Sequence, residues 1–104
     1  MKFPTTITIL SHEYEIRLED PAAWSDKYGH MVEGDQVIHI NETAHPQQTV
    51  NTLMHEIIHA IDAMTTQSLE EKQVNTLATG LVAVFRDNPG LANLFTKKLT
   101  PEKK

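Results

Sequence analysis

The first part of the chain alternates apolar and polar residues in two runs that a short polar segment separates. The runs are Thr5–Leu10 and Tyr14–Leu18, and Ser11–Glu13 lies between them. Such alternation is typical of a strand with one buried face, because successive side chains of a strand point to opposite sides. The pattern therefore predicts a β-hairpin with a three-residue connection.

A second hairpin is predicted further along the chain. Lys27–Val32 and Gln36–Asn41 have strand character and flank a glycine-containing turn at Glu33–Asp35. Between the two hairpins, Asp20–Asp26 combines an N-cap residue with a proline at the first helical position, which predicts a helical turn. Trp24, the single tryptophan, is expected to close the sheet as a core anchor.

In the second half of the chain the hydrophobic period becomes that of a helix. A helix is predicted from Pro46, in its first turn, to about Met64. Its apolar stripe consists of Val50, Leu53, Met54, Ile57, Ile58, Ile61 and Met64. The opposite side is polar and carries Gln48, Thr52, His55, His59 and Asp62. The helix is therefore amphipathic, and two histidines share its polar face.

Two further helices are predicted after a break at Thr65–Gln67. Ser68 and Glu71 form a capping-box pattern, which predicts a second helix with Ser68 as its N-cap and its end near Asp87. Leu91–Phe95 predicts a short third helix whose apolar residues pack onto the core. Residues 96–104 are charged and terminal, and we expect them to fray.

These elements predict an α+β fold. A small antiparallel sheet from two N-terminal hairpins would pack on two or three C-terminal helices. The length of 104 residues fits one domain that spans residues 1–104. A chain of this size buries a modest core, so a bound metal ion would add to its stability.

Composition excludes several classes of function. The chain has no cysteine, which rules out disulfides, zinc fingers of the cysteine type and thiol catalysis. Its net charge is −5, and no basic cluster lies outside the C-terminal tail, so binding to nucleic acid is disfavoured. No stretch is long and apolar enough to be a membrane span or the core of a signal peptide, and we expect a cytoplasmic protein.

The polar face of the first predicted helix carries the motif His-Glu-x-x-His at residues 55–59. His55 and His59 are four residues apart, so a helix presents both imidazoles to one metal ion. Glu56 lies beside them, where it could take a proton from a water on the metal without being a ligand. The alternative is that both histidines are solvated side chains on a polar helix face.

The motif provides two protein ligands, whereas catalytic zinc takes three and leaves a fourth position open. The candidates for the third are Asp62, Glu70 and Glu71. Asp62 shares the face of His59, but it could instead accept a hydrogen bond from a ligating imidazole. Glu71 would reach the site if the two helices form an antiparallel hairpin, although its carboxylate could instead serve the capping box with Ser68. His45, in the loop before the helix, is a further metal or substrate contact to consider.

The pattern of these residues resembles the gluzincin metallopeptidases. These enzymes combine His-Glu-x-x-His with a glutamate ligand on the next helix. An Asp or Asn four residues after this glutamate buttresses the metal site. Thr52–Ala60 is also similar to the small ImmA/IrrE-like and SprT-like metallopeptidase domains of bacteria and phages. The resemblance covers about residues 28–85. It implies a minimal zincin-like fold with Zn²⁺ as cofactor. Carried over by position, the resemblance implies that His55, His59 and Glu71 are the metal ligands. It implies that Glu56 is the general base and that Asn75 buttresses the site.

Candidates for contacts to the substrate are less defined in the sequence. Tyr28, His30 and His39 are the local candidates for the residue that stabilises the oxyanion in such enzymes. His39 lies in the strand Val37–Asn41, which directly precedes the motif helix. This strand could form the sheet edge beside the metal cleft and bind an extended peptide by main-chain pairing. The alternative is an ordinary strand.

The sequence thus favours a zinc-dependent metallopeptidase that hydrolyses peptide bonds in a peptide or protein substrate. The alternative is a catalytically weak or inactive zinc-binding protein of phage or bacterial type, which would regulate or inhibit a partner. A third hypothesis is an α+β module without a metal, in which the histidines decorate the surface.

Overall fold

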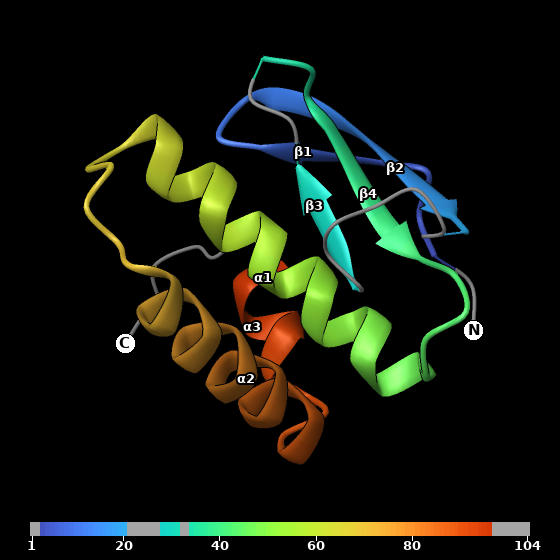
Figure 1. Ribbon diagram of the computed structural model, residues 1–104. Helices are drawn as coiled ribbons and strands as arrows, with labels where there is room; N and C mark the ends of the chain where they lie inside the picture. Colours follow the sequence, from blue (N-terminus) through green and yellow to red (C-terminus); the bar gives the residue numbers. More distant parts are fainter. Residues whose placement is uncertain (1–2, 21–27, 32–33, 97–104) are drawn as a thin grey trace.

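The computed structural model describes residues 3–20, 28–31 and 34–96. It has an α+β fold, as the sequence predicts, with a four-stranded sheet on one side of a helix pair (Figure 1). The strands are β1 (Thr6–Ile9), β2 (His12–Glu19), β3 (Gly29–Met31) and β4 (Val37–Asn41). The helices are α1 (Pro46–Met64), α2 (Glu71–Asp87) and α3 (Leu91–Thr96). Three predictions fall on residues outside the described ones, namely the core position of Trp24, the helical turn after Asp20 and the fraying of residues 97–104. Thr96, the first residue of the predicted tail, ends α3.

The first hairpin is present, but its connection is shorter than predicted. β1 pairs antiparallel with β2, and Ile9 faces His12 across the turn. The turn therefore consists of Leu10 and Ser11, which both have positive φ angles, of 47° and 71°. Two-residue turns of this kind match the right-handed twist of a hairpin. His12, placed in the loop by the sequence pattern, begins β2.

The sheet is mixed, so the prediction of a purely antiparallel sheet is wrong. The strand order is β1-β2-β4-β3, and β4 runs parallel to β2 although it pairs antiparallel with β3. β4 is therefore an internal strand, which excludes the alternative that it forms the sheet edge and leaves the alternative of an ordinary strand. Its burial agrees with this position, because Ile38 and Ile40 have no exposed surface. β3 is the edge strand on the side of the sheet nearest to the helices (Figure 1).

The core has two parts, one on each side of α1. The first lies between the sheet and α1 and is made of Ile9, Tyr14, Ile16, Ile38, Ile40 and Ala60. The second lies between α1 and α2 and contains Ile58, Val74 and Ala78. The apolar stripe of α1 is thus divided between two partners, which fixes the rotation of this helix about its axis. Its polar face is left to border the space between β3 and α2.

Gly29 allows α1 to approach β3 closely. A Cβ atom at this position would lie 2.6 Å from both the His39 carbonyl oxygen and the Thr52 methyl carbon. The side chain of Thr52 is buried in this contact. β3 and α1 are therefore held together at the position where the polar face of α1 emerges.

We expect Gly29→Ala to destabilise the fold by about 1–3 kcal/mol, because the added methyl group meets backbone that cannot move aside. Gly80→Ala is the matched control. Gly80 lies inside α2 with nothing within 4 Å of an added Cβ, so this change should stabilise by about 0.5–1 kcal/mol. Urea unfolding of the three proteins measures both effects. Equal stability of Gly29→Ala and the original chain would contradict the close packing.

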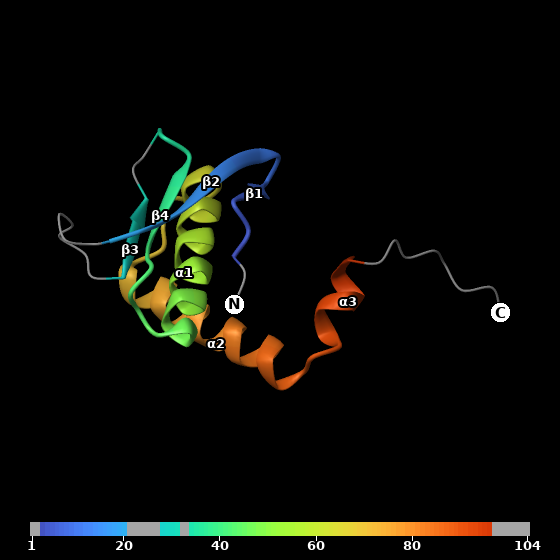
Figure 2. The same ribbon diagram turned by 90° about the vertical axis from the view of Figure 1, so that its right-hand side faces the viewer.

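The start of α2 and the position of α3 differ from the predictions. The N-cap of α2 is Glu70 and not Ser68, and the backbone N–H of Glu70 donates to the Gln73 side-chain oxygen over 2.7 Å. Glu71 is therefore not used as the capping-box carboxylate. α3 does not pack into the core, since none of its residues is buried. Figure 2 shows α1 and α3 rising from the same side of α2.

In the described part of the chain, no helix is long and apolar enough to cross a membrane.

Candidate metal centre

The two motif histidines come together on the polar face of α1. The Nε2 atoms of His55 and His59 lie 3.0 Å apart. Their rings are inclined at 69° to each other. Both side chains are partly buried, with 18% and 29% of their surface exposed. A single turn of helix thus directs two imidazole nitrogens at one point, as the four-residue spacing predicts.

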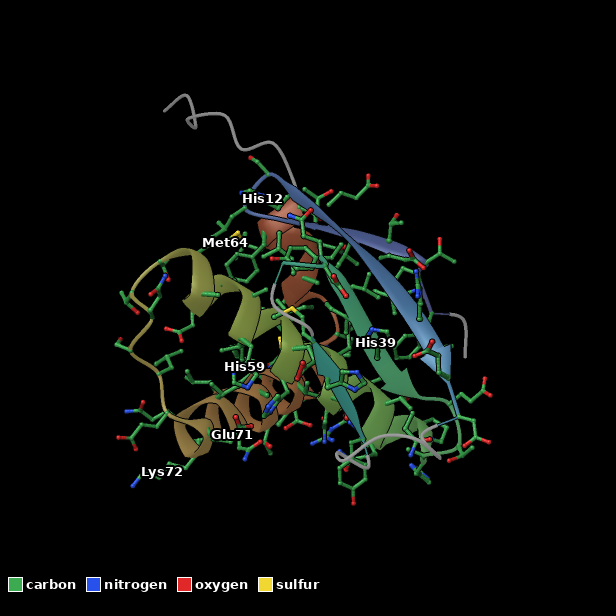
Figure 3. The ribbon with its side chains drawn as sticks, turned by 45° about the horizontal axis from the view of Figure 1, so that its top comes forward. His12, His39, His59, Met64, Glu71 and Lys72 are labelled. Carbon is green, nitrogen blue, oxygen red and sulfur yellow. The ribbon has the colours of Figure 1, made fainter. Side chains whose placement is uncertain are left out.

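Glu71 reaches the same point from the first turn of α2. One of its carboxylate oxygens lies 2.6 Å from His55 Nε2, and the other lies 3.0 Å from His59 Nε2. Figure 3 shows His59 and Glu71 directed toward each other across the space between the two helices. His55, His59 and Glu71 form the one group of metal-ligating side chains found in residues 3–20, 28–31 and 34–96, with ligand atoms all within 4.8 Å.

The other two candidates for the third ligand have structural roles. Glu70 begins α2 as its N-cap residue. Asp62 organises the connection between the helices: its Oδ1 accepts hydrogen bonds from the backbone N–H groups of Ser68 and Leu69, over 3.0 and 3.3 Å, and from the Thr66 hydroxyl. Burial raises the pKa of Asp62, but these donors and nearby His59 outweigh it and hold the pKa below its usual value. The Asp62 carboxylate therefore shapes the turn that delivers Glu71.

We expect Asp62→Ala to weaken zinc binding by about 10–100-fold, the usual effect of losing a group that supports a ligand. The reason is that α2 would no longer start at a fixed place, so Glu71 would be misplaced. In the Glu71→Ala background the same change should have little effect, because the residue through which Asp62 acts is gone. Zinc titration with a competing chelator measures all four proteins. If Asp62→Ala weakens zinc binding equally in the original chain and in the Glu71→Ala variant, Asp62 stabilises the fold without acting through Glu71.

Glu56 lies beside the cluster and is the most buried of its carboxylates. The residue is 5% exposed, and its Oε1 lies 3.9 Å from His55 Nε2. It borders the cavities on both sides of the cluster. It follows His55 directly on α1 and is not a member of the metal-ligating group. Glu56 can therefore face a water or a substrate atom near the cluster without binding the metal itself.

Two cavities flank the cluster and share four lining residues, Gly29, His55, Glu56 and Glu71. The smaller, about 360 Å³, extends along the first half of α1 and is lined by Gln48, Asn51, Thr52, Asn75 and Thr79, with Tyr28. The larger, about 600 Å³, extends over β3 toward the end of α1 and includes Tyr14, Met31 and Ala63. Of the described residues that line them, none is Lys or Arg. The cluster thus lies midway along an open, uncharged to acidic cleft.

The remaining predicted site residues are distributed unequally. Tyr28 and Asn75 line the smaller cavity, and His30 lines the larger. His39 lies on the face of the sheet away from α1, where it stacks on His30 with ring centroids 4.5 Å apart and bonds to Glu19. It is therefore separate from the cluster (Figure 3). His45 caps α1 by accepting from the Gln47 N–H, so it is not a metal contact in this structure.

Apart from Tyr28 and Asn75, sequence reasoning did not identify the amide and hydroxyl groups that line the smaller cavity. Gln48 and Thr52 were recognisable as members of the polar face that also carries His55 and His59. Asn51 and Thr79 gave no such signal, because their place in the cavity depends on how α1 and α2 cross. The importance of Gly29 was likewise hidden, since it follows from the packing of α1 on β3.

Comparison with known proteins gave no match: no family model fits the chain, and no curated protein or solved structure is significantly similar to it. The resemblance to gluzincins therefore stays a prediction that rests on the motif residues.

Proposed function

We propose that this chain is a zinc-dependent peptidase. The observation that carries the proposal is the convergence of His55, His59 and Glu71 on one point, with the Glu56 carboxylate buried beside it. Two histidines and a glutamate are the protein ligands of a known class of catalytic zinc sites, which keeps one position open for water or substrate.

The donor set and its spacing suit zinc. Ligand atoms around a tetrahedral zinc ion lie about 3.3 Å apart, given bonds of about 2.0–2.1 Å. The two imidazole nitrogens and the nearest Glu71 oxygens are separated by 2.6–3.0 Å, close to this value. Imidazole also favours zinc and other transition metals over magnesium and calcium, which prefer sites made of oxygen atoms. His55, His59 and Glu71 would therefore hold the ion.

A zinc ion in this position would lower the pKa of a water molecule to about 7 and polarise the carbonyl group of the scissile peptide bond. Glu56 is the group that takes the proton of the attacking water, and it later delivers this proton to the leaving amine. Its burial keeps bulk water away from the carboxylate. Asp62 holds the turn before Glu71, so that the third ligand meets the two histidines.

The cleft suits a substrate that extends on both sides of the reacting bond. Its two cavities meet at Glu56 and the cluster, so the residues before and after a scissile bond would occupy one cavity each. Tyr28 is the candidate hydrogen-bond donor to the substrate on the side of the smaller cavity. His39 is not proposed as a substrate contact, since it lies on the other face of the sheet.

Digestion of a diverse peptide library, followed by mass spectrometry, tests this function. We expect cleavage by the zinc-loaded chain, loss of cleavage with a chelator, and recovery when zinc is returned. The absence of cleavage by protein with one zinc ion per chain would overturn the peptidase proposal and favour the alternative, a zinc-binding regulatory protein.

A further inference from the structure

Helix α2 carries an exposed apolar stripe that the fold of one chain does not cover. Leu77, Leu81 and Val84 lie four and three residues apart, so they share one face of the helix. Each of them keeps at least 40% of its surface exposed. The side of α2 that packs on α1 is a different one, made of Val74 and Ala78, and the buried Val82 lies four residues after Ala78 on the same side.

Helix α3 adds further exposed apolar surface next to this stripe. Leu94 is 54% exposed and Phe95 is 71% exposed. The contact that joins α3 to α2 is the edge of the Phe95 ring against Phe85, with centroids 6.2 Å apart. A helix of six residues is too short to be stable in water without packing against a partner. Additional packing on its apolar side would therefore stabilise it.

We propose that this face, made of Leu77, Leu81, Val84, Leu94 and Phe95, is the interface of a homodimer. In this arrangement α3 of each copy packs on the α2 stripe of the other copy. The α2 stripe and the apolar side of α3 belong to the same chain. One two-fold axis therefore pairs each stripe with the α3 of the other copy, and the assembly closes as a dimer. Figure 2 shows that α3 stands away from the sheet.

The available area agrees with a second copy as the occupant. If a fully exposed large apolar side chain offers about 150–200 Å², the five residues expose about 450 Å² in each copy. This is in the middle of the range of about 300–600 Å² for the largest apolar patch of a monomer, a patch that often has a function. Two copies would bring together about 900 Å², and a polar rim would raise the total above the roughly 1,000 Å² of a specific interface.

Sedimentation of the full chain over a wide range of concentrations tests the interface. We expect a concentration-dependent dimer, which Leu81→Glu and Phe95→Glu each weaken by at least about tenfold, because each places a charge in the buried contact. Leu18→Glu is the matched control, since Leu18 is similarly exposed but lies on β2. Its dimer should be unchanged. Circular dichroism verifies that every variant is folded.

Cross-linking gives a second measurement that does not depend on these substitutions. Because the chain has no cysteine, Leu81→Cys and Phe95→Cys can be made singly, and a short bismaleimide should join a mixture of the two. Replacing either partner by Leu18→Cys should abolish the product. A monomeric original chain at all concentrations, or a dimer that neither glutamate variant weakens, would overturn the proposal. None of these results depends on zinc or peptidase activity.

Discussion

Replacing Glu56 by glutamine is expected to reduce peptide hydrolysis by about 10²–10⁴-fold, the usual contribution of a general base. Glutamine has nearly the same size as glutamate, so this buried position on α1 should accept it. Its amide cannot take a proton from the attacking water. Glu56 is not among the three clustered ligands, and zinc binding should therefore be retained.

The measurement is the rate of cleavage of the best library peptide, together with the zinc content of each protein. Both are needed, because a variant that has lost its metal would also be inactive. Glu42→Gln is a suitable control, since it removes a carboxylate from the loop before α1, away from the residues lining the cleft. Full activity of Glu56→Gln with normal zinc content would exclude Glu56 as the base.

Replacing Glu71 by alanine is expected to weaken zinc binding by more than about 100-fold. The loss should exceed the 10–100-fold effect of groups that merely support a ligand, because Glu71 would itself bind the ion. His55 and His59 would remain as a two-nitrogen site on α1. The fold should survive, since Glu71 is largely exposed and takes no part in either core cluster.

Glu70→Ala provides a matched control for this change. Glu70 is the neighbouring glutamate, but it begins α2 as an N-cap residue and lies outside the metal-ligating group. Its loss should cost about 0.5–2 kcal/mol of stability and leave one zinc per chain. Elemental analysis and chelator titration distinguish the two variants. Retention of tight zinc binding by Glu71→Ala would show that the third ligand lies elsewhere.

The helices and the motif were well predicted because their signals are local. The extent of α1, from Pro46 to Met64, follows from a proline at its start and an apolar stripe along its length. The end of α2 at Asp87 follows from the Asn-Pro-Gly sequence after it. His55 and His59 meet because a helix of any origin brings residues four apart together. Glu71 was favoured as the third ligand over Asp62 and Glu70, but its meeting with the histidines depends on how α2 packs against α1, which no local signal determines.

The arrangement of the strands could not be predicted in the same way. Alternation determines which residues of a strand share a face, but it does not determine the neighbouring strand or its direction. Val37–Asn41 is the internal strand next to β2. Ile38 and Ile40 face the core, so His39 lies on the outer face of the sheet. The N-cap residue of α2 was also predicted wrongly, because two overlapping capping-box patterns are present. Ser68 and Glu71 match a capping box, but Glu70 and Gln73 form one a little further on, and Asp62 engages the Ser68 N–H instead.

The three clustered side chains all lie between His55 and Glu71, within one helical hairpin, whereas the sheet requires β2 to find β4 across a long connection. Local contacts form faster than distant ones during folding, because less chain entropy is lost in closing a short loop. The proposed metal centre can therefore assemble before the parallel strand pair does. A bound zinc ion would then join α1 to α2 before the sheet has formed. The order in which the parts of the chain fold would therefore depend on the zinc concentration.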